Sequence, residues 1–429
     1  MNMKAPRGTK DLLPNETSKW EYVERIIKEI CHTYHYSEIR TPLFEHTEVF
    51  KRGVGDSTDI VQKEMYTFQD QGGRSITLRP EGTASVARAF VENKLYGNAV
   101  QPVKLYYFMQ MFRYERPQHG RMRQLNQFGV EVLGSANPQV DAEVIDLAMT
   151  CYKKLGISSL KLVINSLGDK QSRDSHREAL IKHFNPVKDE LCSDCNRRLN
   201  DNPLRVLDCK KDRDHPAMKT APSILDHLNE TSLEYFNQVK AYLDMMDITY
   251  TVDPNLVRGL DYYNHTAFEI MSEAEGFGAI TTLLGGGRYN NLTQELGGPD
   301  VPGIGFGMGL ERLLLAMEAE GADIPLDEGL DTFIITMGED AENASIPLIH
   351  QLRENGIQVD KDYMGRKMKS QFKVADRVGA KYVIIIGGDE LQKQVVPIRN
   401  MATGEQMEVP IKDIVETMKD KLSGGNEHG

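Results

Sequence analysis

The chain has 429 residues, 40% of them hydrophobic, with five cysteines and a formal net charge of -12. This length predicts two or three domains, and the negative charge excludes a protein whose whole surface attracts nucleic acid, although it is compatible with a local basic patch. The low, odd number of cysteines indicates reduced thiols rather than a disulfide framework, and no apolar run of about 18 residues predicts a membrane span, so we expect a cytoplasmic protein.

The first elements of the chain predict a helix that lies on a sheet. Ser18 and Glu21 have the spacing of a capping box, and apolar residues then recur at helical intervals as far as Tyr34. The next predicted elements are a strand over 75–80, a helix over about 83–93, strands over 103–115 and 123–134, and a helix over about 140–155.

The character of the chain changes between 169 and 247. This stretch consists of short, charged helical pieces and loops with proline, which indicates an inserted subdomain. Strand patterns then return over 265–270, 279–286 and 301–309, and a helix follows the last of them. We expect the first unit to extend over 1–325.

From Thr332 onward, strands and helices alternate, with helices near 341–355 and 367–378 and a hairpin over 395–410. Such alternation predicts a separate small α/β domain over 326–429 with a mostly parallel sheet. Within it, residues 361–381 include seven lysines and arginines against two aspartates. This local excess of positive charge is either a basic patch suited to RNA or a solvated helix face.

The hairpin over 111–134 is rich in arginine. Because side chains alternate along a strand, Arg113 and Glu115 share one face, and Gln127, Gly129 and Glu131 share one face of the returning strand. Gly129 leaves a gap over which a small polar molecule could lie between Gln127 and Glu131. The alternative is a solvated outer face with ion pairs across the strands.

In a second stretch, over 303–312, glycine occupies every second position from 303 to 309. One face of this strand therefore has no side chains, so that a flat molecule can approach the backbone. The following helix begins beside Arg312, a setting suited to a phosphate. The spacing matches neither a dinucleotide-binding fingerprint nor a P-loop, and tight strand–helix packing would explain one or two of the glycines but not all four.

Five stretches, in their order along the chain, resemble the histidyl-tRNA synthetases, a family of class II aminoacyl-tRNA synthetases. Residues 112–116 (FRYER) with the returning strand resemble motif 2 of that class, residues 303–313 (GIGFGMGLERL) resemble motif 3, and residues 36–50 resemble motif 1, which forms the dimer interface there. Residues 77–83 (TLRPEGT) and 256–269 (LVRGLDYYNHTAFE) resemble signatures of the histidyl enzymes. The resemblance extends over essentially the whole chain.

The resemblance implies an α+β fold: an antiparallel-sheet catalytic domain over 1–325 with a helical insertion over 169–247, and an α/β anticodon-binding domain over 326–429. It implies ATP-dependent ligation of L-histidine to tRNA(His) through a histidyl-adenylate, in a cytoplasmic homodimer that uses motif 1. Mg²⁺ is expected with the ATP phosphates, but the sequence contains no dedicated metal cage and we assign no ligand.

The resemblance also implies roles for individual residues on the ATP side. Arg113 and Arg258 would bracket the α-phosphate and the attacking carboxylate, and Arg121 and Arg312 would lie toward the outer phosphates, because guanidinium forks fit both oxyanions. Glu115 belongs to the same ATP-binding set. Without the neighbouring signature, Arg258 reads as a surface arginine before a turn.

On the histidine side, the resemblance implies that Glu81 and Thr83, with Gln127, hold the α-amino group. The alternative for Glu81 is that it offsets a helix dipole. Glu131 and Tyr263 would bond the imidazole nitrogens. Tyr262 and Tyr289 are further candidates that could equally be packing aromatics.

The chain departs from the family pattern at the adenine site. Where family members often have a phenylalanine on the returning strand, this chain has Leu125, with an aromatic at Phe128 instead. Adenine would then rest on an aliphatic surface. In the hairpin loop, Gln118, His119 and Arg123 are candidates for contact with the acceptor stem.

The insertion contains Cys192, Cys195, Cys209 and His215 at a spacing that could hold zinc. The alternative is that the thiols are packing residues, since the resemblance requires no metal.

Two other functions compete with ligation of histidine. A synthetase-like regulatory subunit of histidine biosynthesis would be expected to lack the terminal domain or some of the arginines. A synthetase for another amino acid would leave Glu131 and the tyrosines without partners.

Overall fold

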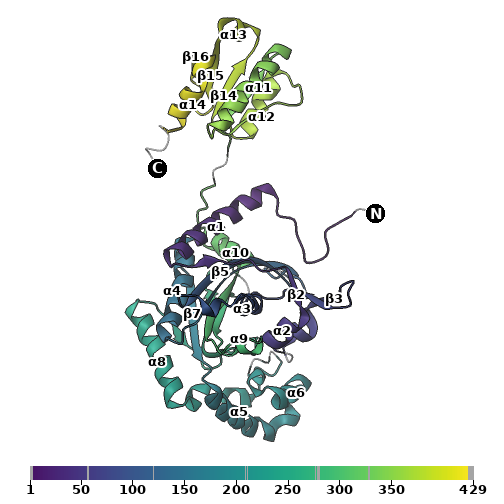
Figure 1. The fold of residues 1–429 in the computed structure, drawn as a ribbon, viewed down its shortest axis with the longest axis vertical. Coiled ribbons are helices and arrows are strands. Elements are labelled where there is room, and N and C mark those ends of the chain that lie inside the picture. Colours follow the sequence, from purple (N-terminus) through teal and green to yellow (C-terminus); the bar gives the residue numbers. More distant parts are fainter. Residues whose placement is uncertain are drawn as a thin grey trace. The chain divides into compact units, whose positions relative to one another are not determined.

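The computed structural model describes residues 3–55, 58–118, 120–207, 209, 211–275, 277, 281–326 and 329–423. It divides into two compact units, Met1–Ile324 and Pro325–Gly429 (Figure 1). None of the described helices combines the length and the apolar character that crossing a bilayer requires.

The first unit is built on an eight-stranded sheet in the order β1-β5-β6-β11-β10-β9-β7-β8. Its inner strands are antiparallel, and only the edge strands β1 and β8 pair in parallel, within the described residues. The strands are β1 (Ser37–Glu38), β5 (Val103–Phe112), β6 (Gln124–Leu133), β7 (Leu160–Ser166), β8 (Thr251–Val252), β9 (Asn264–Ser272), β10 (Thr282–Arg288) and β11 (Gly303–Gly309). The predicted α+β class is confirmed.

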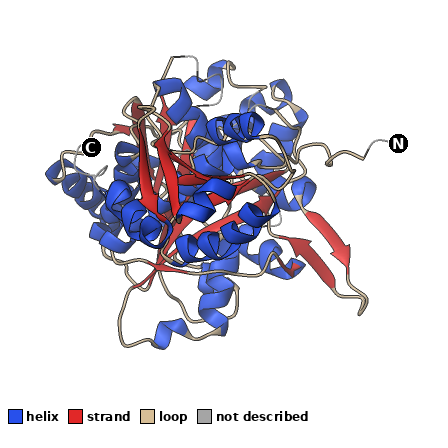
Figure 2. Cartoon of the chain, turned by 90° about the horizontal axis from the view of Figure 1, so that it is seen from above, coloured by secondary structure: helices blue, strands red, loops and turns tan. Residues whose placement is uncertain are grey.

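Helices cover both faces of this sheet (Figure 2). On one face, α1 (Pro14–Thr33), α4 (Pro138–Lys154), α8 (Glu230–Met245) and α10 (Leu310–Glu320) bury the large apolar core. On the other face, α3 (Thr83–Glu92) and α9 (Leu292–Glu295) pack beside a smaller core rich in tyrosine. This second face has room for a site because fewer apolar side chains fill it.

Helix α1 begins five residues earlier than the capping-box pattern predicted, which would make Lys19 its first residue. Pro14 occupies its first turn and the hydroxyl of Ser18 donates to the carbonyl of Pro14 rather than capping the helix. Proline is favoured at this position because the first helical N–H groups have no partner within the helix.

A small antiparallel sheet in the order β2-β4-β3 flanks the first unit. It is formed by β2 (Phe44–His46), β3 (Tyr66–Gln69) and β4 (Ser75–Leu78), with α2 (Thr47–Val54) and the short helical turns η1 (Ile60–Glu64) and η2 (Leu95–Gly97) nearby in sequence. The predicted strand that leads into a helix near 83 is therefore β4 followed by α3.

Most of the segment between β7 and β8 forms a small core of its own. Its last helix, α8, is not part of that core and packs on α4 instead. In Figure 1 its helices α5 and α6 form the teal lower part of the first unit. The elements are α5 (Lys170–Phe184), η3 (Asn185–Glu190), α6 (Ser193–Asp201), η4 (Pro203–Val206), α7 (Pro216–Lys219) and η5 (Ile224–His227).

The second unit has a five-stranded sheet in the order β13-β12-β14-β15-β16. Strands β13, β12 and β14 are parallel, and the predicted hairpin adds two antiparallel strands, so the sheet is mixed rather than mostly parallel. The elements are β12 (Thr332–Thr336), α11 (Glu339–Glu354), β13 (Val359–Lys361), α12 (Met368–Arg377), β14 (Tyr382–Ile386), α13 (Gly388–Lys393), β15 (Val395–Asn400), β16 (Gln406–Pro410), η6 (Ile411–Asp413) and α14 (Ile414–Ser423).

Candidate active site

Three neighbouring strands place glycines side by side on the face that α3 flanks. Gly129 of β6 pairs with Gly307 of β11, which pairs with Gly285 of β10. Tyr107 on β5 and Glu269 on β9 are the outer partners of this row. Because residues in register lie on the same face of a sheet, the row forms a bare floor between two walls.

The floor is open in one place and covered in another. A Cβ atom added at Gly307 would come no closer than 3.6 Å to its neighbours, the amide atoms of Gln127. A Cβ atom at Gly285 would overlap the guanidinium group of Arg258. Arg258 therefore rests directly on the backbone of β10, while a flat ligand can approach the backbone of β11 at Gly307.

An open cleft of about 290 Å³ lies over this floor. It is large enough for part of a nucleotide, since ligand pockets start at roughly 300 Å³. Six of the residues predicted to bind ATP or histidine line it, namely Arg113, Glu115, Arg121, Leu125, Gln127 and Arg312.

Arg113 and Arg258 come from distant parts of the sequence and lie within electrostatic reach of each other. Nε of Arg113 donates to the carbonyl of Pro80 over 2.7 Å. Arg258 is ion-paired with Glu269, and its guanidinium carbon lies 5.6 Å from the ring centroid of Tyr263. Burial lowers the pKa of Arg113 and the positive charge of Arg258 lowers it further. Two close guanidinium groups favour an anion such as phosphate or carboxylate.

The side chain of Arg258 retains an unused donor. Its Nε atom is buried without a hydrogen-bond partner among the described residues. Because a buried donor without a partner costs free energy, this atom is suited to meet a ligand.

A second pair of arginines borders the cleft. Arg121 is ion-paired with Glu115, and Arg312 donates to the carbonyls of Gly120 and Thr282. Burial lowers the pKa of Arg312, as does the nearby positive charge of Arg121. This pair, too, would be stabilised by a bound anion.

Glu131 is fully buried and accepts hydrogen bonds from three hydroxyl groups. The donors are Thr83 at 2.7 Å, Tyr107 at 3.4 Å and Tyr289. Burial raises the pKa of Glu131 to about 8. A raised pKa favours the protonated form of this carboxyl group, which can donate as well as accept.

Glu81 lies at the start of α3, where its two carboxylate oxygens accept from the backbone N–H groups of Thr83 and Ala84, each over 2.8 Å. Burial raises its pKa. The expected alternative, an interaction with the helix N-terminus, is thus present. It leaves room for a ligand, because each carboxylate oxygen has a second lone pair.

The three candidate tyrosines form one buried aromatic group. The ring centroids of Tyr262 and Tyr263 lie 4.5 Å apart, and those of Tyr262 and Tyr289 lie 5.6 Å apart. The hydroxyl of Tyr262 donates to Glu81 over 3.5 Å. These residues are packing aromatics, as the alternative interpretation proposed. Tyr262 and Tyr289 also contact the two buried carboxyl groups, Glu81 and Glu131.

Leu125 and Phe128 lie on opposite faces of β6. Leu125 lines the cleft, whereas Phe128 is fully buried in the large core, with its ring centroid 5.6 Å from that of Phe306. Phe128 cannot stack on a ligand in the cleft, so Leu125 provides the apolar surface there.

Two residues of the site were not among the sequence candidates. Glu269 holds Arg258, and Tyr107 lies over Gly129 and bonds Glu131. Glu269 carries a weak sequence signal, because it is a charged residue within an apolar strand. Tyr107 carries none, because it resembles any other aromatic residue of a buried strand.

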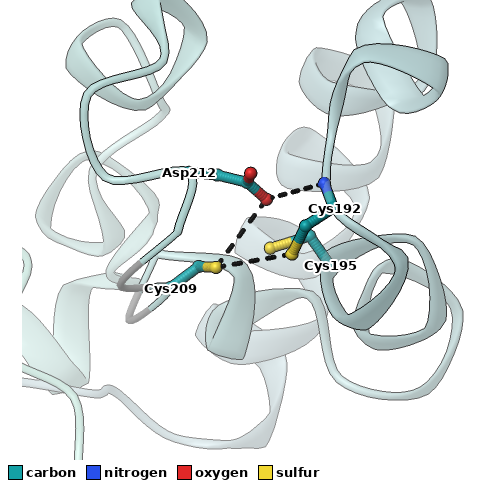
Figure 3. Close-up of side chains that lie close together, drawn as sticks. All are labelled: Cys192, Cys195, Cys209 and Asp212. Atoms are coloured by element: carbon teal, nitrogen blue, oxygen red, sulfur yellow. Dashed lines mark hydrogen bonds between the residues drawn. The ribbon is translucent and has the colours of Figure 1, made fainter.

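The cysteines of the insertion come together, but not with His215. Sγ of Cys192, Cys195 and Cys209 and a carboxylate oxygen of Asp212 lie within 4.8 Å of one another (Figure 3). His215 instead accepts from the backbone N–H of Ala217 at Nδ1 and faces Glu190 at Nε2. The predicted fourth member of the set is therefore wrong, and Asp212 takes its place.

The candidates in the hairpin loop differ in how they are held. Gln118 is exposed and forms a β-bridge with Arg121. The guanidinium group of Arg123 lies 3.9 Å from the ring centroid of Tyr114. His119 lies outside the described residues.

The basic stretch of the second unit lies on and beside α12. Most of its cationic side chains are exposed, namely those of Arg366, Lys367, Lys369, Lys373, Arg377 and Lys381. Tyr363, in the loop before α12, is 67% exposed. The stretch therefore offers both positive charge and an accessible aromatic ring.

The chain is similar to known proteins over both units. A family model described as histidyl-tRNA synthetase matches residues 8–313, and one described as an anticodon binding domain matches residues 331–421. The histidine–tRNA ligase of Oceanobacillus iheyensis is 67% identical over 425 residues, which are 99% of this chain and 99% of that protein.

Solved structures agree with these matches. The crystal structure of apo S. aureus histidyl-tRNA synthetase is 51% identical with a TM-score of 0.85, over 97% of this chain and 100% of that one. An ATP phosphoribosyltransferase regulatory subunit/histidyl-tRNA synthetase from Bacillus halodurans has a TM-score of 0.64 over 90% of this chain and 99% of that one. It is only 22% identical and shares the fold alone.

Proposed function

This chain belongs to the histidyl-tRNA synthetase family, and we propose that it ligates L-histidine to tRNA(His) in an ATP-dependent reaction with a histidyl-adenylate intermediate. The observation that supports this most directly is that Arg113 lines the cleft together with Gly285 and Gly307, while Arg258 rests on the backbone of Gly285. The high identity to a histidine–tRNA ligase over the full chain favours catalysis over the regulatory function.

In the first step, the carboxylate of histidine attacks the α-phosphorus of ATP and pyrophosphate leaves. Such a transfer depends on positioning and on stabilisation of charge. Arg113 and Arg258 would hold the two anionic reactants together, and the unused Nε donor of Arg258 is available for this contact. Arg121 and Arg312, with Glu115 beside them, would bind the outer phosphates.

The adenine ring would lie between the bare backbone at Gly307 and the side chain of Leu125. Mg²⁺ would supply further positive charge to the phosphates. The cleft carboxylates Glu115 and Glu311 already have protein partners, Arg121 and Asn126, so we assign no metal ligand and expect the ion to enter with the nucleotide.

The histidine side chain would reach the buried carboxyl group of Glu131, with Tyr263 as a second partner. A group with a pKa near 8 can share one proton with an imidazole, which an apolar pocket cannot do. Glu81, Thr83 and Gln127 would receive the α-amino group, and Tyr262 and Tyr289 would close the pocket.

Recognition of tRNA would involve both units. Exposed cations along α12 suit the phosphate backbone and Tyr363 suits base stacking. In the first unit, Gln118 and Arg123, together with His119, remain the candidates for the acceptor stem.

We further propose a cytoplasmic homodimer that uses the motif 1 segment. Leu43, just before β2, is 45% exposed, and Phe44, the first residue of β2, is 54% exposed. These two adjacent apolar side chains would be covered if this segment met a second subunit.

The test is pyrophosphate exchange with each of the 20 standard amino acids, followed by charging of tRNA(His). We expect histidine alone to support exchange and tRNA(His) to accept it. Exchange with a different amino acid would reject the substrate, and no exchange with any amino acid would favour the regulatory function.

A further inference from the structure

The insertion contains a compact group of four potential metal ligands, far from the residues of the cleft in sequence. We call it the Cys192 cluster: Cys192, Cys195, Cys209 and Asp212 (Figure 3). Among the described residues, it is the one place where three or more His, Cys, Asp or Glu side chains meet in this way.

The cluster is formed by two short loops with the same internal spacing. Cys192 and Cys195 have two residues between them: Cys192 immediately precedes α6 and Cys195 lies in its first turn. Cys209 and Asp212 repeat that spacing after η4. Paired ligands with two residues between them are typical of structural zinc sites, because one turn then presents both ligands to the same point.

Two of the distances between the ligand atoms fit a tetrahedral ion, and all four atoms lie within 4.8 Å of one another. Zinc–sulfur bonds of about 2.3 Å in a tetrahedron place sulfur atoms roughly 3.8 Å apart, and a sulfur and an oxygen ligand about 3.5–3.7 Å apart. Sγ of Cys192 lies 3.7 Å from Sγ of Cys209, and Sγ of Cys209 lies 3.7 Å from Oδ2 of Asp212.

Asp212 distinguishes this cluster from thiols that merely fill space. Cys195 and Cys209 belong to the small apolar core of the insertion, and a cation would favour the half-buried carboxylate of Asp212 beside them. Oδ2 of Asp212 faces the sulfur atoms and also accepts from the backbone N–H of Cys192 over 3.0 Å. That bond fixes the carboxylate in a position from which it can coordinate.

A disulfide explains the group less well. The sulfur atoms of Cys192 and Cys209 are separated by more than a bond length of about 2.05 Å. A disulfide would also leave Cys195 and Asp212 unexplained.

From this geometry we propose that the Cys192 cluster holds one structural zinc ion, bound by three thiolates and one carboxylate. All four ligand positions are filled by protein, so the ion is structural rather than catalytic. Binding releases the three thiol protons to solvent.

A bound ion would stabilise the fold of the insertion. Its own core has only seven buried apolar residues, and small cores of this kind usually need a disulfide or a metal for stability. The ion would join the start of α6 to the loop after η4, and thus hold η4 in place.

The position of η4 matters for the cleft. Arg205 in η4 donates to the carbonyl of Gly259 over 2.7 Å, in the residue after Arg258. Zinc would therefore support the loop that presents Arg258, without itself meeting a substrate.

The experiment is metal analysis of the full chain, purified without chelator under reducing conditions. We expect one zinc per chain. After removal of zinc, titration with Co²⁺ alone should give the intense absorption of tetrahedral cobalt bound to several thiolates. The proposal is overturned if the reduced protein binds neither ion, or if Cys192 and Cys209 are found as a disulfide in reduced preparations.

Matched variants test the ligand set. Asp212→Asn keeps the size of the side chain but removes its charge, and should weaken Co²⁺ binding and lower the zinc content. His215→Ala, three residues further on, should retain one zinc per chain. Equal loss of zinc in both variants, or loss in His215→Ala alone, would reject Asp212 as the ligand. Cys195→Ser should lose the ion; if it is insoluble, the Asp212 and His215 pair decides.

Discussion

Thr83 donates its hydroxyl to Oε1 of Glu131 over 2.7 Å, which joins the first turn of α3 to the buried face of β6. Thr83 also donates its backbone N–H to Glu81. One residue thus links the two buried carboxyl groups proposed to bind the polar ends of histidine. The acid–base behaviour of the pocket follows from this arrangement, because both groups lose solvent when they are packed here.

We predict that histidine binds most tightly between about pH 6.5 and pH 8. Glu131 has a pKa raised to about 8, and free imidazole has a pKa of about 6.5. Within this window the two groups together hold one proton, which they can share in a hydrogen bond. Below it one proton must be released, and above it one must be taken up. The measurement is the Kd for histidine from calorimetry between pH 5.5 and 9.

Glu131→Gln should weaken histidine binding and abolish the alkaline decline. Glu342→Gln, on the first turn of α11, should leave the pH profile unchanged. Without ligand, Glu131→Gln should also change how the free energy of unfolding depends on pH. The pKa of Glu131 is about 8 in the folded protein and 4.5 as its ordinary value, which applies to the unfolded chain. The contribution of Glu131 to the free energy of unfolding is therefore complete below pH 4.5 and is lost as the pH rises toward about 8. A normal alkaline decline in Glu131→Gln would show that another group titrates.

The open backbone at Gly307 gives a second prediction. Gly307→Ala should fold normally, because the new Cβ atom meets nothing closer than 3.6 Å. It should raise the KM for ATP by roughly 10- to 200-fold, the usual effect of one misfitting carbon. Pyrophosphate exchange measures this, and circular dichroism checks the fold. Gly388→Ala, which also has open space, is the control. An unchanged KM for ATP would place the nucleotide elsewhere.

Alternation along single strands predicted much of the site. The face shared by Gln127 and Glu131, and the bare face of 303–309, follow from a period of two residues, which any strand must obey. What the sequence did not contain was the order of the strands. The third glycine of the floor, Gly285, became significant only when β10 was found beside β11. Such pairing depends on contacts between distant segments.

Loops were predicted less well than strands, for a related reason. The spacing of the cysteines suggested His215 as their partner, but the chain turns into α7 at that point and His215 caps this helix. Asp212 reaches the sulfur atoms instead. Spacing in sequence limits which residues can meet, whereas the path of the loop decides which of them do.

Glu269 gives a third prediction, because it holds Arg258 by an ion pair in a partly buried setting. Glu269→Gln should leave Arg258 charged but free to move. We expect kcat for pyrophosphate exchange to fall by up to about 100-fold, since a misplacement of ~1 Å can have that effect. Rapid kinetics with histidine and ATP would measure it. Glu269→Asp should recover part of the rate, and no difference between the two variants would argue against a positioning role.

The basic surface of the second unit gives the last prediction. Lys369 and Lys373 lie one turn apart on α12 and both are exposed. Replacing both with glutamate should raise the KM for tRNA(His) and make it less dependent on salt, because fewer counterions are released from the RNA. Pyrophosphate exchange, which needs no tRNA, should be unchanged. The control is Lys412→Glu with Lys421→Glu, which makes the same change of charge at exposed positions in η6 and α14. If the control raises the KM as much, the effect comes from overall charge, and α12 is then a solvated face rather than an RNA-binding surface.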